Sequence, residues 1–383
     1  MGALLSWDYN KKMGGTHLFD FDTDYIKMFD LEFTNDEKNK MNTNKIEYKK
    51  RIGKLIKKSR QDSKTSECYY CGRPCGRFCN SHSVPAFCLK NIAVNGDVFY
   101  SNTLVSIPLL DYDKGVNESG TFRLICRECD SKIFCDYENP DNYANKPTSK
   151  MLAQIAMKNY LKFISKRLYE VSLFNNMNIE LNMPIGLYEQ KQSVNTMDLQ
   201  EYIVGFKRAK KINEKGWNGE YYLFYYVKLD YVVPVAFQSN ITLVSDFEGS
   251  IINDIYNVSP DYHTKDVHIC IFPLKDCSVI MMFIDSKDKR YRKFYKQLGK
   301  LSHVDKLAAI NYIIFCYSED VFMYKDIDTE VINDEKLIEV SQKTTDALSV
   351  TPMLDPIGFA NENFDLSKMG EIPNLLLEKY KVR

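Results

Sequence analysis

The chain has 383 residues, of which 44% are hydrophobic and 27% charged. This length predicts two or three domains, and the composition is that of a soluble globular protein rather than a disordered or fibrous one. The longest uncharged apolar stretch, residues 231–245, includes Pro234 and is too short to cross a bilayer, so we expect no membrane segment. The charges of the 51 basic and 51 acidic residues cancel, so the net charge neither favours nor disfavours a polyanionic binding partner.

The N-terminal part of the chain predicts a basic helix. The first ten residues lack a basic region followed by an apolar run, so we expect no secretory signal and a cytoplasmic protein. Residues 1–35 predict an irregular or short-stranded lead. Residues 36–64 hold eleven Lys or Arg against four Asp or Glu, and apolar residues at near-helical spacing predict a helix near residues 44–58.

Cysteines are the most informative residues of the chain. Eight of the eleven lie between Cys68 and Cys135, and two pairs have the spacing Cys-x-x-Cys. Such a pair places two thiolates of one tight turn on one ion, so two pairs complete a tetrahedral zinc site. The predicted ligands are Cys68, Cys71, Cys126 and Cys129. Cys75 and Cys79 are alternative ligands, and an iron-sulfur cluster is the alternative group, although no ferredoxin-type run is present.

The segment between the two pairs carries a motif of its own. It begins with Asn80-Ser81-His82-Ser83-Val84-Pro85, and apolar residues then lead into the second pair, which is followed by Asp130-Ser131-Lys132. This pattern resembles the zinc-bearing branch of the HNH nuclease superfamily, with its ββα-metal core. The resemblance covers about residues 67–138. It implies metal-dependent cleavage of nucleic acid, and DNA is favoured over RNA as the substrate.

The resemblance also assigns roles to individual residues. It makes His82 the general base that activates water, and Asp130 the helix residue that binds catalytic Mg²⁺ or Mn²⁺. The chain departs from the family at three positions, because Ser81 stands where an acidic residue is usual, Thr121 lies near the usual Asn, and Asp130 replaces the final His or Asn. Asp136 and Glu138 are either additional carboxylate ligands or solvated charges at the helix end, and the second reading is favoured.

Basic residues next to the second cysteine pair are candidates for phosphate binding. Arg123, Arg127 and Lys132 lie close to it in sequence, where they could hold the flanking phosphates of a nucleic acid. The alternative is that they are ordinary surface cations.

The middle of the chain predicts a helical connector. Thr148 or Ser149 can cap a helix that runs to about Leu173, with one apolar stripe. Residues 178–216 are polar and predict a loop-rich bridge or strands that the pattern does not define.

From Gly219 the pattern changes to short aromatic and β-branched runs. These predict a mostly antiparallel sheet with strands at residues 221–229, 232–238, 242–245, 267–273 and 278–285. A basic helix at 288–299 follows, whose aromatic residues either contact nucleic acid or, as we favour, turn into the core. Ser302-His303-Val304-Asp305 then predicts a capping box for a helix that ends near Tyr317. His263, His268 and His303 are expected to be core or surface residues, and Cys270, Cys277 and Cys316 small buried hydrophobes.

The expected fold is therefore α+β, with an HNH-like ββα or treble-clef zinc module joined by a long helix to a β-rich α+β C-terminal domain. The expected segments are the lead and basic helix (1–65), the zinc module (66–140), the connector (141–217), the β-rich domain (218–325) and an acidic tail that either packs against a basic face or stays mobile (326–383).

Three functions follow from this plan. The first is a metal-dependent endonuclease with structural Zn²⁺ and catalytic Mg²⁺ or Mn²⁺, of a kind that resembles bacterial proteins of phage defence. The second is a zinc module that binds nucleic acid without cutting it. The third is an interaction protein in which zinc only stabilises the fold. In each case the C-terminal domain is expected to bind a protein partner or a second copy of the chain.

Overall fold

The computed structural model describes four short strands within residues 16–31, and residues 45–100, 120–181, 185–257, 259, 261–348 and 355–382. Helices and antiparallel sheets occur together, which confirms the α+β class. Near the N-terminus, β1 (Thr16–His17) pairs with β4 (Asp30–Leu31) and β2 (Asp20–Phe21) pairs with β3 (Asp24–Tyr25). The rest of the predicted lead lies outside the described residues.

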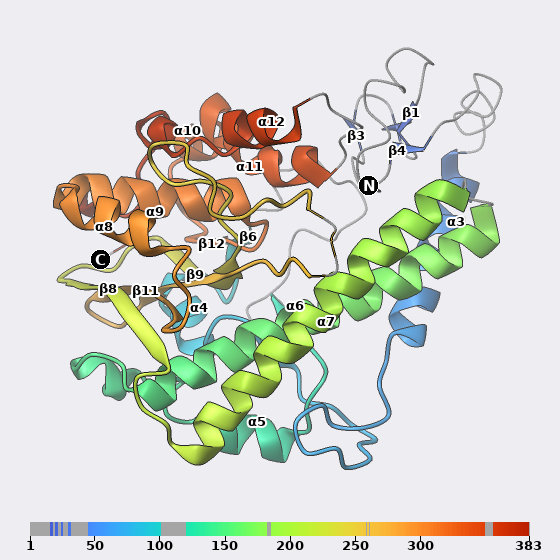
Figure 1. Ribbon diagram of the computed structural model, residues 1–383, viewed down its shortest axis with the longest axis horizontal. Coiled ribbons are helices and arrows are strands. Elements are labelled where there is room, and N and C mark those ends of the chain that lie inside the picture. The colour runs from blue at the N-terminus through green and yellow to red at the C-terminus, as the bar shows by residue number, and fades with distance from the viewer. Residues whose placement is uncertain are drawn as a thin grey trace.

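A six-stranded antiparallel sheet forms the centre of the structure (Figure 1). Its strands, in spatial order, are β6 (Phe99–Tyr100), β12 (Phe322–Met323), β9 (Val235–Ile241), β10 (Val267–Pro273), β11 (Ser278–Asp285) and β8 (Tyr221–Leu229). Every residue of β9 and β10 is buried. Both faces of these strands are therefore covered. β10 is accordingly apolar except for His268, whereas β9 also buries the polar residues 238–240.

Two hydrophobic cores lie on the two faces of the sheet. On one face Phe237, Ile269 and Met282 pack with α8 (Arg292–Lys300) and α9 (His303–Tyr317). The opposite face presents Cys270, Phe272 and Phe283 to a core that also contains residues of α4 (Ala86–Ile92), α5 (Arg127–Ile133) and α6 (Ser149–Leu181). Because side chains alternate along a strand, one set of strands supplies both cores, and the sheet is the middle of three layers.

A pair of long helices covers the second face. α6 and α7 (Ile185–Lys215) lie side by side over most of their length (Figure 1). The expected helix was too short, since α6 continues from Ser149 to Leu181, and the loop-rich bridge predicted for 178–216 was wrong. α7 is polar overall, but Phe206, Ala209 and Ile212 form a narrow buried stripe along it. Packing of that stripe against α6 outweighs the weak periodicity of the sequence.

The segment between the cysteine pairs takes part in the sheet. β6, which lies between Cys71 and Cys126 in sequence, pairs with β12 at the edge of the sheet. α4 from the same segment also contributes Leu89 and Ile92 to the second core. The expected zinc module and β-rich region thus share one hydrophobic core.

The acidic C-terminal region packs onto the first core. α10 (Thr329–Ile332), α11 (Glu335–Leu348) and α12 (Pro356–Asn363) follow α9, and the short 3₁₀ turns η3 (Leu366–Gly370) and η4 (Glu378–Tyr380) follow α12. Leu337 and Leu375 are fully buried in this core. Of the two outcomes foreseen for this region, packing is observed, and apolar contacts rather than a basic face hold it.

Most of the predicted strands are confirmed. The strands at 221–229, 267–273 and 278–285 have their expected bounds, whereas β9 is displaced by three residues and 242–245 is no strand, although Ser245 forms an isolated bridge with Ile251. The Ser302 hydroxyl caps α9 by accepting a hydrogen bond from Asp305 N. In α8, Phe294 is fully buried, which favours the core reading of the aromatic residues. Within the described residues no helix combines the length and apolarity needed to cross a membrane.

Close contact between α6 and α7 generates a stability prediction. A Cβ atom added at Gly205 would lie 2.5 Å from Cζ of Tyr160. Gly205→Ala should therefore lower the free energy of unfolding by about 1–3 kcal/mol, through overpacking, in chemical denaturation. Gly53, in the exposed part of α3 (Lys45–Asp62), has no atom within 4 Å of such a Cβ. The control Gly53→Ala should instead raise stability by about 0.5–1 kcal/mol. Equal effects of the two substitutions would contradict the proposed helix contact.

Candidate metal centre

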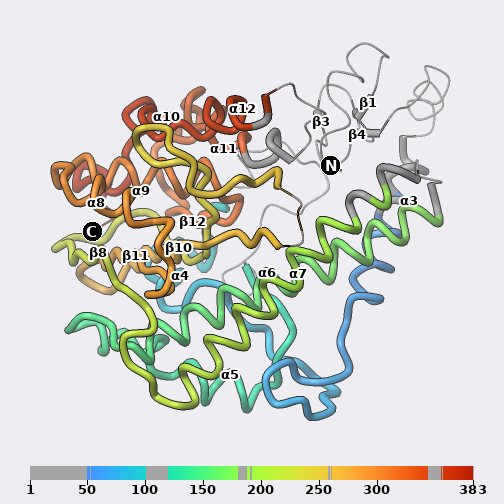
Figure 2. Tube along the Cα trace, in the orientation of Figure 1, coloured from blue at the N-terminus to red at the C-terminus, as the bar shows by residue number. Residues whose placement is uncertain are grey.

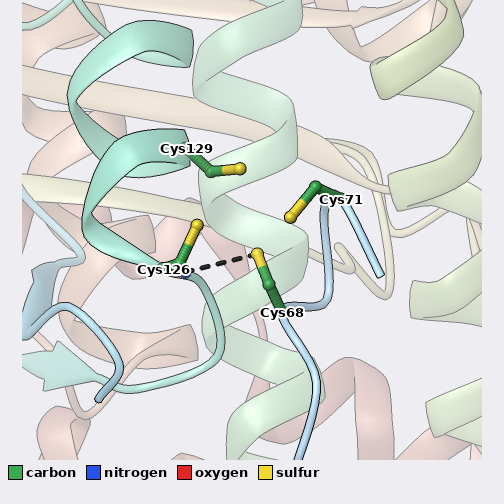
Figure 3. Close-up of side chains that lie close together, drawn as sticks. All are labelled: Cys68, Cys71, Cys126 and Cys129. Carbon is green, nitrogen blue, oxygen red and sulfur yellow. Dashed lines mark hydrogen bonds between the residues drawn. The ribbon is translucent and has the colours of Figure 1, made fainter. Parts of the chain in front are cut away.

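Four cysteine side chains converge on one point in the structure. The Sγ atoms of Cys68, Cys71, Cys126 and Cys129 all lie within 4.8 Å of one another, and Figure 3 shows them facing a common centre. Tetrahedral zinc with bonds of about 2.3 Å separates its sulfur ligands by roughly 3.8 Å, so a small contraction would complete the site. The four predicted ligands are thus brought together, and their donor atoms fit Zn²⁺.

Local backbone geometry explains how each pair presents its thiols. Gly72 N donates to Cys68 O at 2.8 Å, and Gly72 adopts a left-handed φ of 68°, which closes the turn around the first pair. Cys126 is the N-cap residue of α5, so Cys129 lies in the first helical turn on the same side. Cys126 N also donates to Cys68 Sγ at 3.3 Å (Figure 3), which links the two pairs directly.

The two alternative cysteine ligands point elsewhere. The thiol of Cys75 donates to Arg77 O at 3.1 Å, and the thiol of Cys79 donates to Asp130 Oδ2 at 3.3 Å. Burial, followed by the charge of Asp130, raises the pKa of Cys79 to about 11. The Cys79 thiol is therefore engaged by Asp130, and its sulfur is not one of the four clustered sulfurs.

A neighbouring arginine favours the ligand form of Cys71. Arg73 Nε donates to Cys71 Sγ at 3.4 Å, and Arg73 also pairs with Glu128 at 2.7 Å. The hydrogen bonds from Arg73 lower the pKa of Cys71 to about 6. Cys71 is thus largely a thiolate at neutral pH, and the thiolate is the form that binds a metal ion.

His82 lies on a two-stranded hairpin that leads into the centre. β5 (Ser81–His82) pairs antiparallel with β7 (Thr121–Phe122), and α5 follows β7. Because α4 and β6 lie between the two strands in sequence, the chain order is β5, α4, β6, β7, α5, and the word hairpin here means the paired strands β5 and β7 alone. Ser81 and Phe122 are partners and both are buried, whereas His82 and Thr121 are partners and both are half-buried. Because directly opposed residues of a pair share a face, His82 lies on the outer face of the hairpin and Ser81 on the inner one.

Asp130 meets Ser81 on the inner face. Ser81 Oγ donates to Asp130 Oδ1 at 2.5 Å, and Lys158 Nζ from α6 forms an ion pair with the same oxygen at 2.9 Å. Burial alone would raise the pKa of Asp130, but the Lys158 charge and the Ser81 hydrogen bond outweigh it and lower the pKa. Together with the bond from Cys79, both carboxylate oxygens are engaged by protein groups. The role of Asp130 as a ligand of Mg²⁺ or Mn²⁺ stays a prediction.

The two further acidic candidates also have partners. α5 ends at Ile133, before either of them. Asp136 pairs with Lys150 at 2.9 Å, and Glu138 pairs with Lys158 at 3.0 Å. Both carboxylates therefore belong to ion pairs with α6 instead of to a solvated helix end.

The three candidate phosphate-binding residues are exposed around the centre. Arg123 Nε donates to Asn80 Oδ1 at 3.3 Å, and Lys132 pairs with Glu128 at 2.9 Å. Arg127 is at the start of α5. Their binding to nucleic acid stays a prediction.

Lys158 is the residue that sequence reasoning missed. Its side chain is only 1% exposed, and it lies in a run of buried residues from Met151 to Asn159. A lysine within an apolar stripe was the available signal, because a buried ammonium group requires a partner carboxylate. The sequence does not indicate which carboxylates are the partners, because Asp130 and Glu138 precede Lys158 by 28 and 20 residues.

Comparison with protein families, with curated proteins and with solved structures gave no match to this chain. The resemblance to HNH nucleases therefore rests on the quoted motif alone. What the structure adds is a cluster of four cysteines suited to a metal ion.

The cysteine cluster predicts one zinc ion per chain in elemental analysis of purified protein. Cys129→Ser should abolish zinc binding and lower the melting temperature by about 5–10 °C, because one thiolate ligand is lost. Cys135→Ser is the matched control, since Cys135 is exposed and outside the cluster. Full zinc content in Cys129→Ser would contradict this assignment, as would an equal loss in both variants.

Proposed function

We propose that this chain is a zinc-stabilised, HNH-like endonuclease that hydrolyses nucleic-acid phosphodiester bonds with His82 as general base. The observation that carries the proposal is the half-buried His82 on the β5–β7 strand pair, which lies in sequence between the two halves of the four-cysteine cluster. A metal ion on those thiols would hold β7 and α5 to the first cysteine turn. The imidazole then has a defined position while it stays within reach of solvent.

The proposed chemistry needs one general base and residues that hold the substrate phosphates. A neutral imidazole, with an ordinary pKa near 6.5, can accept a proton from the water that attacks phosphorus. The bond between phosphorus and the leaving oxygen then breaks, and that oxygen takes up a proton from solvent, so that one phosphate end and one hydroxyl end are formed. Arg123 and Arg127, both exposed beside the hairpin, could hold neighbouring phosphates. We favour DNA over RNA as substrate.

Zinc would have a structural role in this proposal. Four thiolates leave no open position for substrate, which is the arrangement of structural rather than catalytic zinc. A catalytic Mg²⁺ or Mn²⁺ does not fit the Asp130 oxygens as they are arranged, because Ser81, Lys158 and Cys79 occupy them. We therefore derive no step through that ion.

A reducing compartment suits the cysteine chemistry. All eleven cysteines are free thiols, including the pair Cys88 and Cys270 in the second core. Free thiols in this number are usual in the cytoplasm, where disulfides are rare. We propose a cytoplasmic protein, and a role in defence against phage follows only from the family resemblance.

The role of His82 predicts a loss of cleavage. His82→Ala should slow cleavage of plasmid DNA by about 10²–10⁴-fold, since general-base catalysis contributes that amount. The assay compares zinc-loaded proteins on DNA and on RNA, with and without added Mg²⁺. His303→Ala serves as control, because His303 is exposed at the start of α9. If His82→Ala cleaves as fast as the unchanged protein, the endonuclease proposal fails.

A second candidate function is binding of nucleic acid without cleavage. The occupied oxygens of Asp130 favour it, and so does the outer face of α3. Lys50, Lys54 and Lys57 are exposed there at helical spacing, on the side opposite the buried Leu55 and Ser59. A row of cations on one helix face suits the phosphate backbone.

The basic face of α3 predicts salt-sensitive binding that does not depend on His82. Replacing Lys50, Lys54 and Lys57 together by Ala should weaken binding to double-stranded DNA and reduce the slope of log K against log salt by about 2–3, since three phosphate contacts are lost. The control replaces the exposed Lys289, Lys296 and Lys300 near α8. Fluorescence anisotropy at several salt concentrations measures the slope of log K against log salt for both triple variants. Equal slopes would show that the α3 face does not bind DNA.

A further inference from the structure

A buried lysine occupies the oxygen cluster in which the HNH resemblance places a divalent metal ion. Lys158 Nζ lies 2.7 Å from Ser81 Oγ, 2.9 Å from Asp130 Oδ1 and 3.0 Å from Glu138 Oε1. The ring of Phe134 lies beneath the ammonium, with its centroid 4.0 Å from Nζ. The oxygens come from the hairpin, from α5 and from the segment after α5, so a single cation joins three parts of the module.

We infer that the Lys158 ammonium is the resident cation of the Ser81, Asp130 and Glu138 oxygens, and that it takes the place of a divalent metal ion. An ammonium group has three N–H donors, and here three oxygens accept them. The side chain is 1% exposed, so water does not compete for these donors. Every donor of the buried charge is satisfied within the protein.

The charges of the cluster require a cation at this place. Asp130 and Glu138 supply two carboxylates, both half-buried and both within 3.0 Å of Lys158 Nζ, and two carboxylates held at one site repel each other when no cation lies between them. Lys158 satisfies that requirement from a helix outside the segment expected to form the zinc module. The predicted ion at Asp130 and the lysine are thus two solutions to one electrostatic problem.

The two cations cannot share the cluster. A divalent ion bound to Asp130 Oδ1 would lie next to the ammonium, and like charges at such a distance repel strongly in a buried site. Lys158 has little freedom to withdraw, because Met157 and Asn159 beside it are buried and α6 continues well beyond both sides. The unchanged protein should therefore have no divalent-cation site at Asp130.

The position of Lys158 also makes it a positioning residue for the hairpin. It bonds Ser81, the neighbour of His82, and Asp130, the neighbour of Cys129. α6 in turn packs in the core beneath the sheet. The ammonium thereby fixes the inner face of the hairpin against the helix that connects the two halves of the chain.

Binding of Mn²⁺ by the zinc-loaded, full-length protein tests this inference, with electron paramagnetic resonance as the readout of bound ion. The unchanged protein and the variant Asp130→Asn should bind Mn²⁺ equally, because Asp130 holds no Mn²⁺ while Lys158 is present. Lys158→Ala vacates the oxygens and should bind Mn²⁺ at least about tenfold more tightly, because the local charge becomes more negative by one unit. The double variant Lys158→Ala, Asp130→Asn should lose that gain.

Lys150→Ala is the matched control, since Lys150 lies on the same helix and pairs with Asp136 at 2.9 Å but is exposed. It should bind Mn²⁺ as the unchanged protein does. Binding that depends on Asp130 in the unchanged protein overturns the inference. A folded, zinc-loaded Lys158→Ala without Mn²⁺ binding also overturns it.

If Lys158→Ala does not fold, the comparison of the unchanged protein with Asp130→Asn still decides the inference. No arm of this experiment measures cleavage of nucleic acid. Its failure is therefore distinct from failure of the proposed endonuclease function.

Discussion

Four thiols from two distant segments meet on either side, in sequence, of the strands that carry His82, in a cluster that could hold one metal ion. Cys68 and Cys71 precede the hairpin, and Cys126 and Cys129 begin α5 directly after it. Without a cation, four sulfurs this close have no strong mutual attraction, and those that are thiolates repel. With a bound Zn²⁺ the same sulfurs become a cross-link, because metal binding contributes folding free energy to such modules.

A second cation, the ammonium of Lys158, anchors the inner face of the same hairpin. The two centres lie on either side of α5, since Cys129 belongs to one and Asp130 to the other. This arrangement leaves His82 on the outer, half-buried face. The inner face of the module thus carries the ion pair with Lys158, while the outer face carries the imidazole of His82.

The module is also continuous with the rest of the molecule. β6 extends the central sheet, and α4 packs on β10 together with residues of α6. Figure 2 shows the chain after α3 descending on the right of the view towards the region of α5, and α3 itself contacts α6.

Local sequence determined the features whose causes are local. The Cys-x-x-Cys spacing predicted the ligands, β-branched and aromatic runs located three strands without error, and Ser302 marked the start of α9. Tertiary structure decided the rest. The polar α7 is a helix because a narrow stripe packs on α6, and β6 is a strand because β12 offers it a partner. Lys158 meets Asp130 only after the chain folds, since no pattern along a sequence encodes which buried charges will face each other.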